Sequence, residues 1–362
     1  MCSLSAPVTE SHIRVGFDMT FPQRNQAGSG AYARSLVAAV KAIAEVEALE
    51  LSGPARSGIA GTLRWLASGA GAAVRASGAA LLHCPSFVTP WNVRVPVVIS
   101  VLDLSTRLFP HDYPLEWRVY ERRFLPPRAR AAAMVIAISD NTRRDVIAAY
   151  GIKPERIVTI YPGIDPEFSR AAPAQRPEGA PRLLFPGAPI ARKNLEAVLR
   201  CLAAAPAGSA TSQARLEISG ATAKRFPNHA ATIASLGLIH RVSWLGQVPR
   251  EQMPGLMAGA DAVVYPSLYE GFGFPPLEAM AAGTPVVAAN RSCLPEILGD
   301  AALLVDPDDE AAFARALEEV LTRQELRERL IAAGRARAAM FTWARTAEST
   351  VDVYRRVLGI AS

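Results

Sequence analysis

Two glutamates eight positions apart, Glu270 and Glu278, frame the part of this chain whose residue types are best suited to chemistry. Between them lies the turn Gly271-Phe272-Gly273-Phe274. A carboxylate accepts hydrogen bonds from hydroxyl groups, and glycines let a backbone turn tightly and come close to a ligand. Either glutamate alone is equally well explained as a solvent-exposed turn or helix residue. Together with the glycine turn, they favour a unit that holds a diphosphate with its backbone and sugar hydroxyls with its carboxylates.

The elements around this turn position both carboxylates. Residues 261–266 form a short apolar run that ends at a proline, which indicates a buried strand. Residues 275–282 predict a helix with its prolines in the first turn, and Gly283 ends it before a strand over 285–289. The free N–H groups at this helix start are expected to face a bound anion. Glu270 would repel phosphate there, so we expect it to bind neutral hydroxyls.

The stretch from Glu270 to Val287 resembles the E-x7-E signature of the GT4-type retaining glycosyltransferases, also described as glycosyl transferases group 1. The resemblance continues through residues 290–296 and 299–307 and covers roughly Ile13 to Arg345. It implies the GT-B fold, in which two Rossmann-like doubly wound domains face a cleft. It also implies a nucleotide-sugar donor held mainly by the second domain, an acceptor held mainly by the first, and no metal. For Glu270 and Glu278 it implies contacts to the transferred sugar and to the ribose, and for Gly271, Phe272, Gly273 and Phe274 it implies donor binding.

A second segment, residues 186–195, carries two adjacent cations, Arg192 and Lys193, after a glycine loop at Gly187. An exposed basic helix start is the plain interpretation, while neutralisation of a diphosphate is the functional one. The segment resembles the family's G-x-x-x-x-R-K-N sequence, which implies that Lys193 contacts the donor diphosphate, with Arg192 second. Many relatives carry an arginine where this chain has Ala188, so phosphate neutralisation is expected to rest more on Lys193 and the helix N-terminus.

Three further segments resemble the family, and two of them are assigned to the donor on that basis. Gly28-Ser29-Gly30 follows the first strand, and although a plain turn explains a lone G-x-G equally well, the matching family loop approaches the donor phosphates or the reacting sugar. The turn at residues 245–249 matches the place where relatives hold the nucleobase by main-chain contacts, which implies a role for Val248. Residues 138–145 are similar to the family's Ser-x-x-Thr helix start, for which a helix cap is the favoured interpretation.

The segment from Val98 to Leu104 departs from the family pattern, which reads as a strand followed by His-Asp-Leu. The family histidine touches the donor sugar, but this chain has Leu102, which can neither form a hydrogen bond nor move a proton. Three alternatives stay open: the protein works without the histidine, another group such as Asp103 or His111 takes part, or activity is impaired. We assign Asp103 to the catalytic site and His111 to the surface.

Strand and helix patterns alternate along the chain, which predicts an α/β protein with parallel sheets and covering helices. We divide it into a first domain over residues 1–170, a proline- and alanine-rich linker over 171–181, a second domain over 182–345, and a helix over 346–362 that returns to the first domain. The first long helix is predicted from about Ala31 to Val46. Predicted strands cover residues 12–18, 80–83, 97–101, 134–138, 157–161, 182–187, 216–220 and 242–246.

The bulk composition limits the class of protein. The chain has 362 residues, enough for two domains, and its composition, half hydrophobic and a fifth charged, is typical of a soluble globular protein. No apolar run reaches the roughly 20 residues that span a bilayer, and we expect no secretory signal at Met1–His12. The four cysteines have no paired or metal-like spacing, which favours a cytoplasmic setting. A net charge of +6 and the basic stretch Arg118–Arg130 indicate either a solvated arginine face, which is favoured, or peripheral contact with the anionic inner membrane face.

Taken with the resemblance, these residues predict a retaining hexosyltransferase without a metal or other cofactor. The donor would be a nucleotide-diphosphate sugar, with mannose as the favoured hexose, and the acceptor a glycan or lipid-linked precursor of a cell-surface polysaccharide. No motif that reads nucleic-acid bases is present, so a nucleic-acid partner is not expected. Two alternatives remain: a nucleotide-sugar-binding pseudo-enzyme or regulatory subunit, suggested by Leu102 and Ala188, and a nucleotide-sugar epimerase of the same fold.

Overall fold

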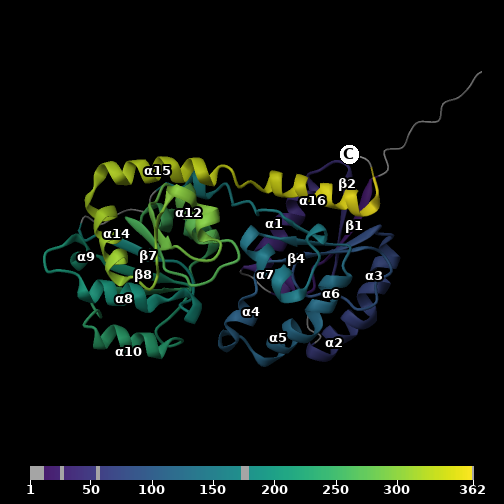
Figure 1. Ribbon diagram of the computed structural model, residues 1–362, viewed down its shortest axis with the longest axis horizontal. Coiled ribbons are helices and arrows are strands. Elements are labelled where there is room, and N and C mark those ends of the chain that lie inside the picture. Colours follow the sequence, from purple (N-terminus) through teal and green to yellow (C-terminus); the bar gives the residue numbers. More distant parts are fainter. Residues whose placement is uncertain (1–11, 25–27, 54–57, 173–178, 361–362) are drawn as a thin grey trace, which may run out of the picture.

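The computed structural model describes residues 12–24, 28–53, 58–172 and 179–360. Within these ranges the chain forms two lobes side by side, each built on one sheet (Figure 1). The predicted linker lies mostly at 173–178, outside the described residues.

The first sheet has six parallel strands in the order β2-β1-β3-β4-β5-β6. The strands in chain order are β1 (Ile13–Asp18), β2 (Val46–Leu51), β3 (Leu81–Cys84), β4 (Val97–Val101), β5 (Met134–Ala137) and β6 (Ile157–Thr159). β3 and β5 are buried along their whole length, as expected for strands covered by helices on both faces. The carboxyl ends of β1, β3 and β4, three adjacent strands, therefore lie along one edge, where ligands bind in such sheets.

The second sheet repeats this arrangement with six parallel strands in the order β12-β11-β10-β7-β8-β9. Its strands are β7 (Arg182–Phe185), β8 (Arg215–Ser219), β9 (Val242–Gly246), β10 (Ala262–Tyr265), β11 (Val286–Ala289) and β12 (Leu303–Val305). The order reverses between β7 and β10, which is the switch point where doubly wound sheets bind ligands. The segments after these two strands carry Lys193 and Glu270.

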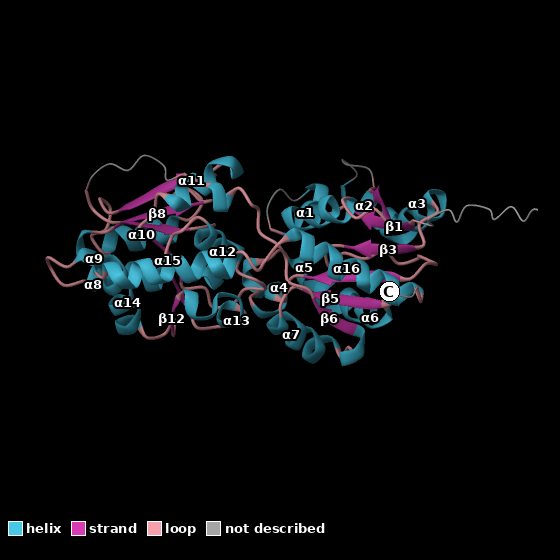
Figure 2. Ribbon diagram, turned by 90° about the horizontal axis from the view of Figure 1, so that it is seen from above, coloured by secondary structure: helices cyan, strands magenta, loops and turns pink. Residues whose placement is uncertain are grey.

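Helices pack on both sheets, as Figures 1 and 2 show. The first lobe contains α1 (Ser29–Lys41), α2 (Gly58–Arg64), α3 (Ala70–Ser77), α4 (Ser105–Leu108), α5 (Leu115–Val119), α6 (Leu125–Ala131) and α7 (Asp140–Tyr150). The second contains α8 (Leu195–Ala204), α9 (Ala210–Gln213), α10 (Pro227–Ser235), α11 (Met253–Ala258), α12 (Phe274–Ala281), α13 (Leu294–Leu298), α14 (Glu310–Thr322) and α15 (Gln324–Ala338). A π-helical turn, η4 (Tyr120–Phe124), joins α5 to α6.

The last helix, α16 (Trp343–Leu358), leaves the second lobe and packs against α1 of the first (Figure 1). Its crossing segment runs beside the one that leads out of the first lobe: the N–H of Ile164 donates to the carbonyl of Phe341 over 3.1 Å. The hydroxyl of Thr346 donates to the carbonyl of Tyr161 over 2.9 Å. A side chain at Gly163 would meet the backbone N of Trp343 at 2.1 Å, so this crossing needs a glycine. The two segments that connect the lobes are therefore hydrogen-bonded to each other.

The predicted helix from Ala31 to Val46 is partly wrong. α1 ends at Lys41, and residues 46–51 form β2 at the edge of the first sheet. β2 carries two exposed glutamates: Glu47 pairs with Arg14 at 2.9 Å and Glu50 pairs with Lys41 at 2.5 Å. Charged side chains are tolerated on an edge strand, which pairs on only one side. The sequence analysis also missed β12.

Candidate active site

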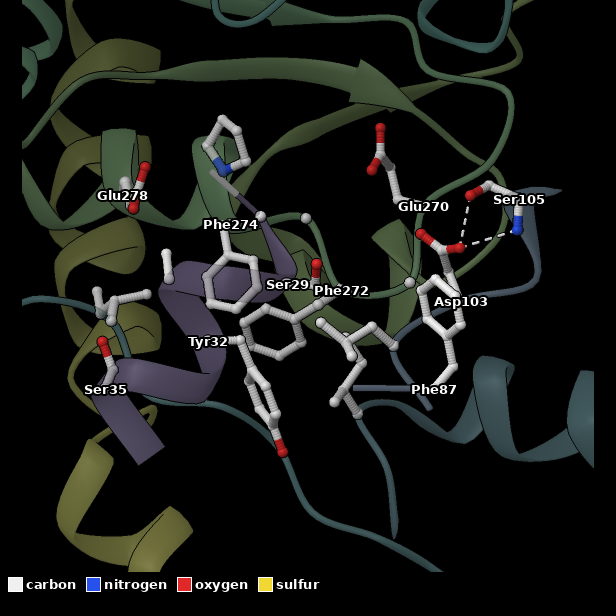
Figure 3. Close-up of a pocket in the computed structure, with 18 of the residues that line it drawn as sticks. Ser29, Tyr32, Ser35, Phe87, Asp103, Ser105, Glu270, Phe272, Phe274 and Glu278 are labelled. Carbon is white, nitrogen blue, oxygen red and sulfur yellow. Dashed lines mark hydrogen bonds between the residues drawn. The ribbon is translucent and has the colours of Figure 1, made fainter. Parts of the chain in front are cut away.

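One pocket between the lobes collects most of the candidate residues (Figure 3). The first lobe contributes Gly28, Ser29 and Asp103 to its lining. The second contributes the larger set: Arg192, Lys193, Glu270, Gly271, Phe272, Gly273, Phe274 and Glu278. In Figure 3 Glu278 lies at the left of the view and Glu270 to the right of centre, with Phe274 and Phe272 below and between them.

Glu270 is the centre of a compact ionic cluster. Arg192 Nη1 and Lys193 Nζ each lie 2.7 Å from Glu270 Oε1, and the Ser267 hydroxyl donates to the same oxygen over 2.6 Å. Burial alone would raise the pKa of the Glu270 carboxyl, but the charges of Lys193 and Arg192 outweigh burial and lower its pKa to about 2. The carboxylate is therefore ionised at neutral pH, and two cations against one anion leave the cluster a net positive charge.

Lys193 is held from a second side by Tyr265, which ends β10. Its ammonium donates to the Tyr265 hydroxyl and lies 4.2 Å from the centre of the tyrosine ring. Burial lowers the pKa of Lys193, and Glu270 offsets part of that change. Asn194, the next residue, takes a left-handed conformation with a φ of 54°, which turns the chain from the cationic segment into α8. The cations are thus fixed by the start of a helix and by a strand end.

Glu278 lies in α12 and is almost fully buried, with 4% of its surface exposed. Its partner is Arg250, whose Nη2 lies 2.8 Å from Glu278 Oε1 and whose guanidinium carbon lies 4.8 Å from the centre of the Phe168 ring. Burial raises the pKa of Glu278, and Arg250 offsets part of that rise. The sequence analysis missed Arg250, although it comes directly after the turn that it assigned to the nucleobase.

The glycine turn brings the two lobes into backbone contact. A side chain at Gly271 would meet the carbonyl oxygen of Leu102 at 1.8 Å, so only glycine allows this approach. Gly273 has a φ of 88° and is the N-cap residue directly before α12. The expectation that several free N–H groups point at an anion needs correction, because Pro275 and Pro276 occupy the first turn of α12 and have no N–H.

Asp103 follows β4 on the opposite wall of the pocket. Its Oδ1 accepts hydrogen bonds from the N–H of Ser105 over 2.8 Å and from the Ser105 hydroxyl over 2.5 Å. That hydroxyl lies 2.6 Å from the hydroxyl of Tyr113. Burial lowers the pKa of Arg192, but the negative charges of Glu270 and then Asp103 raise that pKa by more than burial lowers it, so the net shift is upward. Asp103 is therefore close enough to the cluster around Glu270 to interact with it.

Several hydrogen bonds hold the lobes together beside the pocket. Glu296, which lies in α13, accepts from the N–H groups of Asp140 over 2.6 Å and Asn141 over 2.9 Å, at the start of α7. The Tyr269 hydroxyl donates to Asp145 Oδ2 over 2.8 Å. A carboxylate at a helix N-terminus is stabilised by the helix dipole, so the second lobe caps a helix of the first. The sequence analysis found neither Glu296 nor Tyr269.

The remaining candidates take varied positions. Ser139 caps α7, where its side chain accepts from the N–H of Thr142, as the favoured interpretation of that segment predicts. Gly30 is buried within α1, and neither Gly187 nor Val248 is among the described residues that line the pocket. Leu102 does line it.

Neither a metal centre nor a membrane span emerges from the described residues. Within those ranges, no group of three or more histidine, cysteine, aspartate and glutamate side chains could hold a metal ion. Among the same residues, every helix is too short or too polar to cross a bilayer.

Comparison with known proteins gives the family. Residues 32–168 match the family described as Glycosyltransferase Family 4, and residues 169–337 match the family described as Glycosyl transferases group 1. O-antigen chain mannosyltransferase B of Escherichia coli is 30% identical over 286 residues, which are 76% of this chain and 74% of that protein. The chain belongs to the GT4-type group 1 glycosyltransferases.

Other known proteins are similar over part or nearly all of the chain. D-inositol 3-phosphate glycosyltransferase of a Nocardioides strain is 33% identical over 247 residues, which are 62% of this chain and 54% of that protein. Among solved structures, sucrose-phosphate synthase of Thermosynechococcus elongatus superimposes with a TM-score of 0.76 at 21% identity, over 96% of this chain and 99% of that one. Anabaena HepE, in complex with UDP and glucose, gives a TM-score of 0.75 at 18% identity, over 95% and 100%. These likenesses confirm the GT-B fold.

Proposed function

We propose that this glycosyltransferase retains the anomeric configuration and moves a hexose, with mannose favoured, from a nucleotide-diphosphate sugar to a glycan or lipid-linked acceptor in cell-surface polysaccharide synthesis. The observation that carries the proposal is the cluster of Arg192, Lys193 and Glu270 in the same pocket as Glu278. One carboxylate at each end suits the two sugar rings of a nucleotide sugar, and the cations suit the diphosphate between them.

In the chemical step the site must stabilise a departing diphosphate and a sugar with oxocarbenium character. The net positive charge around Glu270 is buried, where electrostatic interactions are stronger than in water. Lys193 and Arg192 would neutralise the charge that grows on the leaving oxygen, and this supply of positive charge supports a reaction without a metal. Glu270 would accept hydrogen bonds from the hydroxyls of the transferred sugar and so orient it, with no nucleophilic role. Asp103, on the facing wall, would orient the acceptor hydroxyl.

The comparisons support the choice of substrates. Two relatives are named mannosyltransferases: the O-antigen chain enzyme of Escherichia coli and MMP alpha-(1->4)-mannosyltransferase of Mycolicibacterium hassiacum, which is 30% identical over 64% of this chain. Anabaena HepE has been solved with UDP-glucose. These names support a nucleotide-sugar donor and favour mannose as the transferred hexose.

A surface on the first lobe supports the lipid-linked class of acceptor. Leu108, Leu115 and Phe124 expose 51%, 65% and 42% of their surface on α4, α5 and η4. Arg122 and Arg123 are exposed on the same elements. Apolar side chains interleaved with arginines suit the interface of an anionic membrane. We call this set the α5 surface.

A thermal-shift screen across GDP- and UDP-sugars, followed by a hydrolysis and transfer assay, tests the proposal. We expect GDP-mannose to stabilise the full-length protein and to be turned over. Glu270→Ala and Lys193→Ala should abolish turnover, whereas Lys153→Ala, at an exposed lysine, should not. If no nucleotide sugar stabilises the protein, the donor assignment is wrong. Binding without turnover would favour the pseudo-enzyme, and interconversion of UDP-sugar epimers would favour the epimerase.

A further inference from the structure

Three aromatic side chains line the first-lobe side of the pocket and are not used by the donor assignment. Phe21, Phe87 and Trp117 are each half-buried and belong to the pocket lining. The rings of Phe21 and Trp117 are 5.0 Å apart, those of Phe87 and Trp117 are 5.7 Å apart, and both pairs meet edge to face. We call these three residues the aromatic wall.

The fold explains why the aromatic wall lies beside Asp103. Phe21, Phe87 and Asp103 follow β1, β3 and β4, which are adjacent in the first sheet. Parallel strands end at the same edge of a sheet, so the three side chains must gather there. Trp117 is added from α5. The wall and Asp103 therefore form one surface that faces the cluster around Glu270 across the pocket.

Asp103 gives this surface a polar edge. Both of its hydrogen bonds from Ser105 go to Oδ1. In Figure 3 the other carboxylate oxygen has no bond drawn and points toward the side of the pocket where Glu270 lies. Tyr113 and Thr106, which also line the pocket, add hydroxyl groups nearby. An anionic group set against aromatic rings can accept hydrogen bonds from an uncharged polyhydroxyl ligand.

From this arrangement we propose that the aromatic wall and Asp103 form the acceptor subsite, and that it binds the pyranose ring of an uncharged sugar. One face of a pyranose carries C–H groups, which pack on the electron-rich face of an aromatic ring. Its ring edge carries hydroxyls, one of which donates to Asp103 and is thereby directed toward the donor. The subsite rests on the proposed function, since it faces the donor pocket.

Charge distinguishes this acceptor from a phosphorylated polyol. The cations that line the described part of the pocket are Arg192, Lys193 and Arg250, and each is paired with a glutamate of the second lobe. The acceptor side presents the carboxylate of Asp103, which would repel a phosphate group. The curated relatives include both an O-antigen chain mannosyltransferase and D-inositol 3-phosphate glycosyltransferases, so the two acceptor classes are real alternatives within the family.

Saturation-transfer NMR on the full-length protein tests the subsite without the donor. The probes are the methyl α-glycosides of mannose, glucose and galactose, with myo-inositol 1-phosphate as the charged competitor. We expect at least one glycoside to bind through the C–H face of its ring and to bind more tightly than the inositol phosphate. Trp117→Leu should weaken that binding about tenfold, and Phe87→Leu provides a second test if the first variant is unstable.

Trp91→Leu is the matched control, because Trp91 is 38% exposed on the same lobe but stacks on Phe124 outside the pocket. It should bind the glycoside as the wild type does. Asp103→Asn should also weaken glycoside binding, through loss of a charge-assisted hydrogen bond. The subsite is overturned if no glycoside binds, if the inositol phosphate binds more tightly, or if both aromatic variants bind as the wild type does. Failure of the nucleotide-sugar screen would overturn the proposed donor function. It would not change the outcome of the glycoside-binding experiment, which uses no donor.

Discussion

Replacing Gly271 with alanine should separate the two lobes without damaging either one. The new Cβ would lie 1.8 Å from the carbonyl oxygen of Leu102, and 2.9 Å from both the carbonyl carbon of Leu102 and the Cβ of Asp103. An ordinary carbon–oxygen contact is about 3.3 Å, so the glycine turn and the end of β4 must part by about 1.5 Å. The nearest atom is a backbone carbonyl oxygen, which cannot rotate away as a side chain can.

The expected cost follows from this displacement. A misplacement of about 1 Å between reacting groups lowers a rate about 100-fold. We therefore expect Gly271→Ala to lower kcat/KM for the donor found in the screen by at least about 100-fold. Small-angle X-ray scattering should show a larger radius of gyration, because the lobes can no longer close onto each other. Far-UV circular dichroism should stay unchanged, since the contact joins the segment after β4 to the segment before α12 and lies outside the strands and helices.

Gly255→Ala is the control for this experiment. Gly255 lies in α11, and the atom nearest to a new Cβ is the carbonyl oxygen of Ala172 at 3.7 Å, an ordinary contact. Alanine is favoured over glycine within a helix by about 0.5–1 kcal/mol, so this variant should be fully active and slightly more stable. Wild-type kcat/KM and an unchanged radius of gyration for Gly271→Ala would refute the backbone contact.

Three further predictions concern the ribose carboxylate, the contact between the lobes and the α5 surface. Arg250→Gln removes the charge that keeps the pKa of Glu278 from rising further, so Glu278 should become protonated at a higher pH than in the wild type. Donor affinity, measured by calorimetry at a series of pH values, should therefore be lost at a higher pH as the solution is acidified. The same loss of affinity at the same pH in both proteins would contradict this. Glu296→Gln removes the negative charge that caps α7, and the lost interaction is about 1 kcal/mol. This loss should lower kcat/KM about fivefold and enlarge the radius of gyration. An unaltered radius of gyration would argue against the contact. Leu115→Glu should weaken co-sedimentation with phosphatidylglycerol vesicles, whereas Ile239→Glu, at an exposed position of the second lobe, should sediment as the wild type does; equal losses would remove the assignment.

Local sequence patterns predicted most strands because each is a short apolar run between turn residues. The prediction failed at Val46, where the sequence from Ala31 to Leu51 is rich in alanine, leucine and glutamate and suits a helix throughout. The structure ends the helix early and uses the edge of the sheet, where Glu47 and Glu50 remain exposed beside basic partners. Pairing with β1 decides this outcome, and a local pattern cannot report it.

In the candidate site, too, local sequence patterns predicted some residues and contacts between distant segments decided the others. Glu270, Glu278 and Lys193 were found because each lies in a segment with a recognisable glycine turn or helix start. Their partners were missed or only partly recognised because they come from distant parts of the chain. Arg250 reaches Glu278 from the segment after β9, and Glu296 reaches α7 across more than 150 positions. The first contact follows from how the second lobe folds and the second from the closure of the two lobes, and sequence spacing encodes neither.

The position of α16 has a consequence for how the protein is made. The first lobe buries its α1 face against Val351 and Tyr354, and the Tyr354 hydroxyl lies 2.6 Å from Nδ1 of the buried His83. Yet α16 begins more than 180 residues after β6 ends. At roughly 5–20 residues per second, a ribosome needs roughly 10–40 s to supply that helix after the first sheet has emerged. During this time the nascent first lobe therefore exposes an apolar face. A chain released after Phe341 should bind a hydrophobic dye that the full-length protein does not bind.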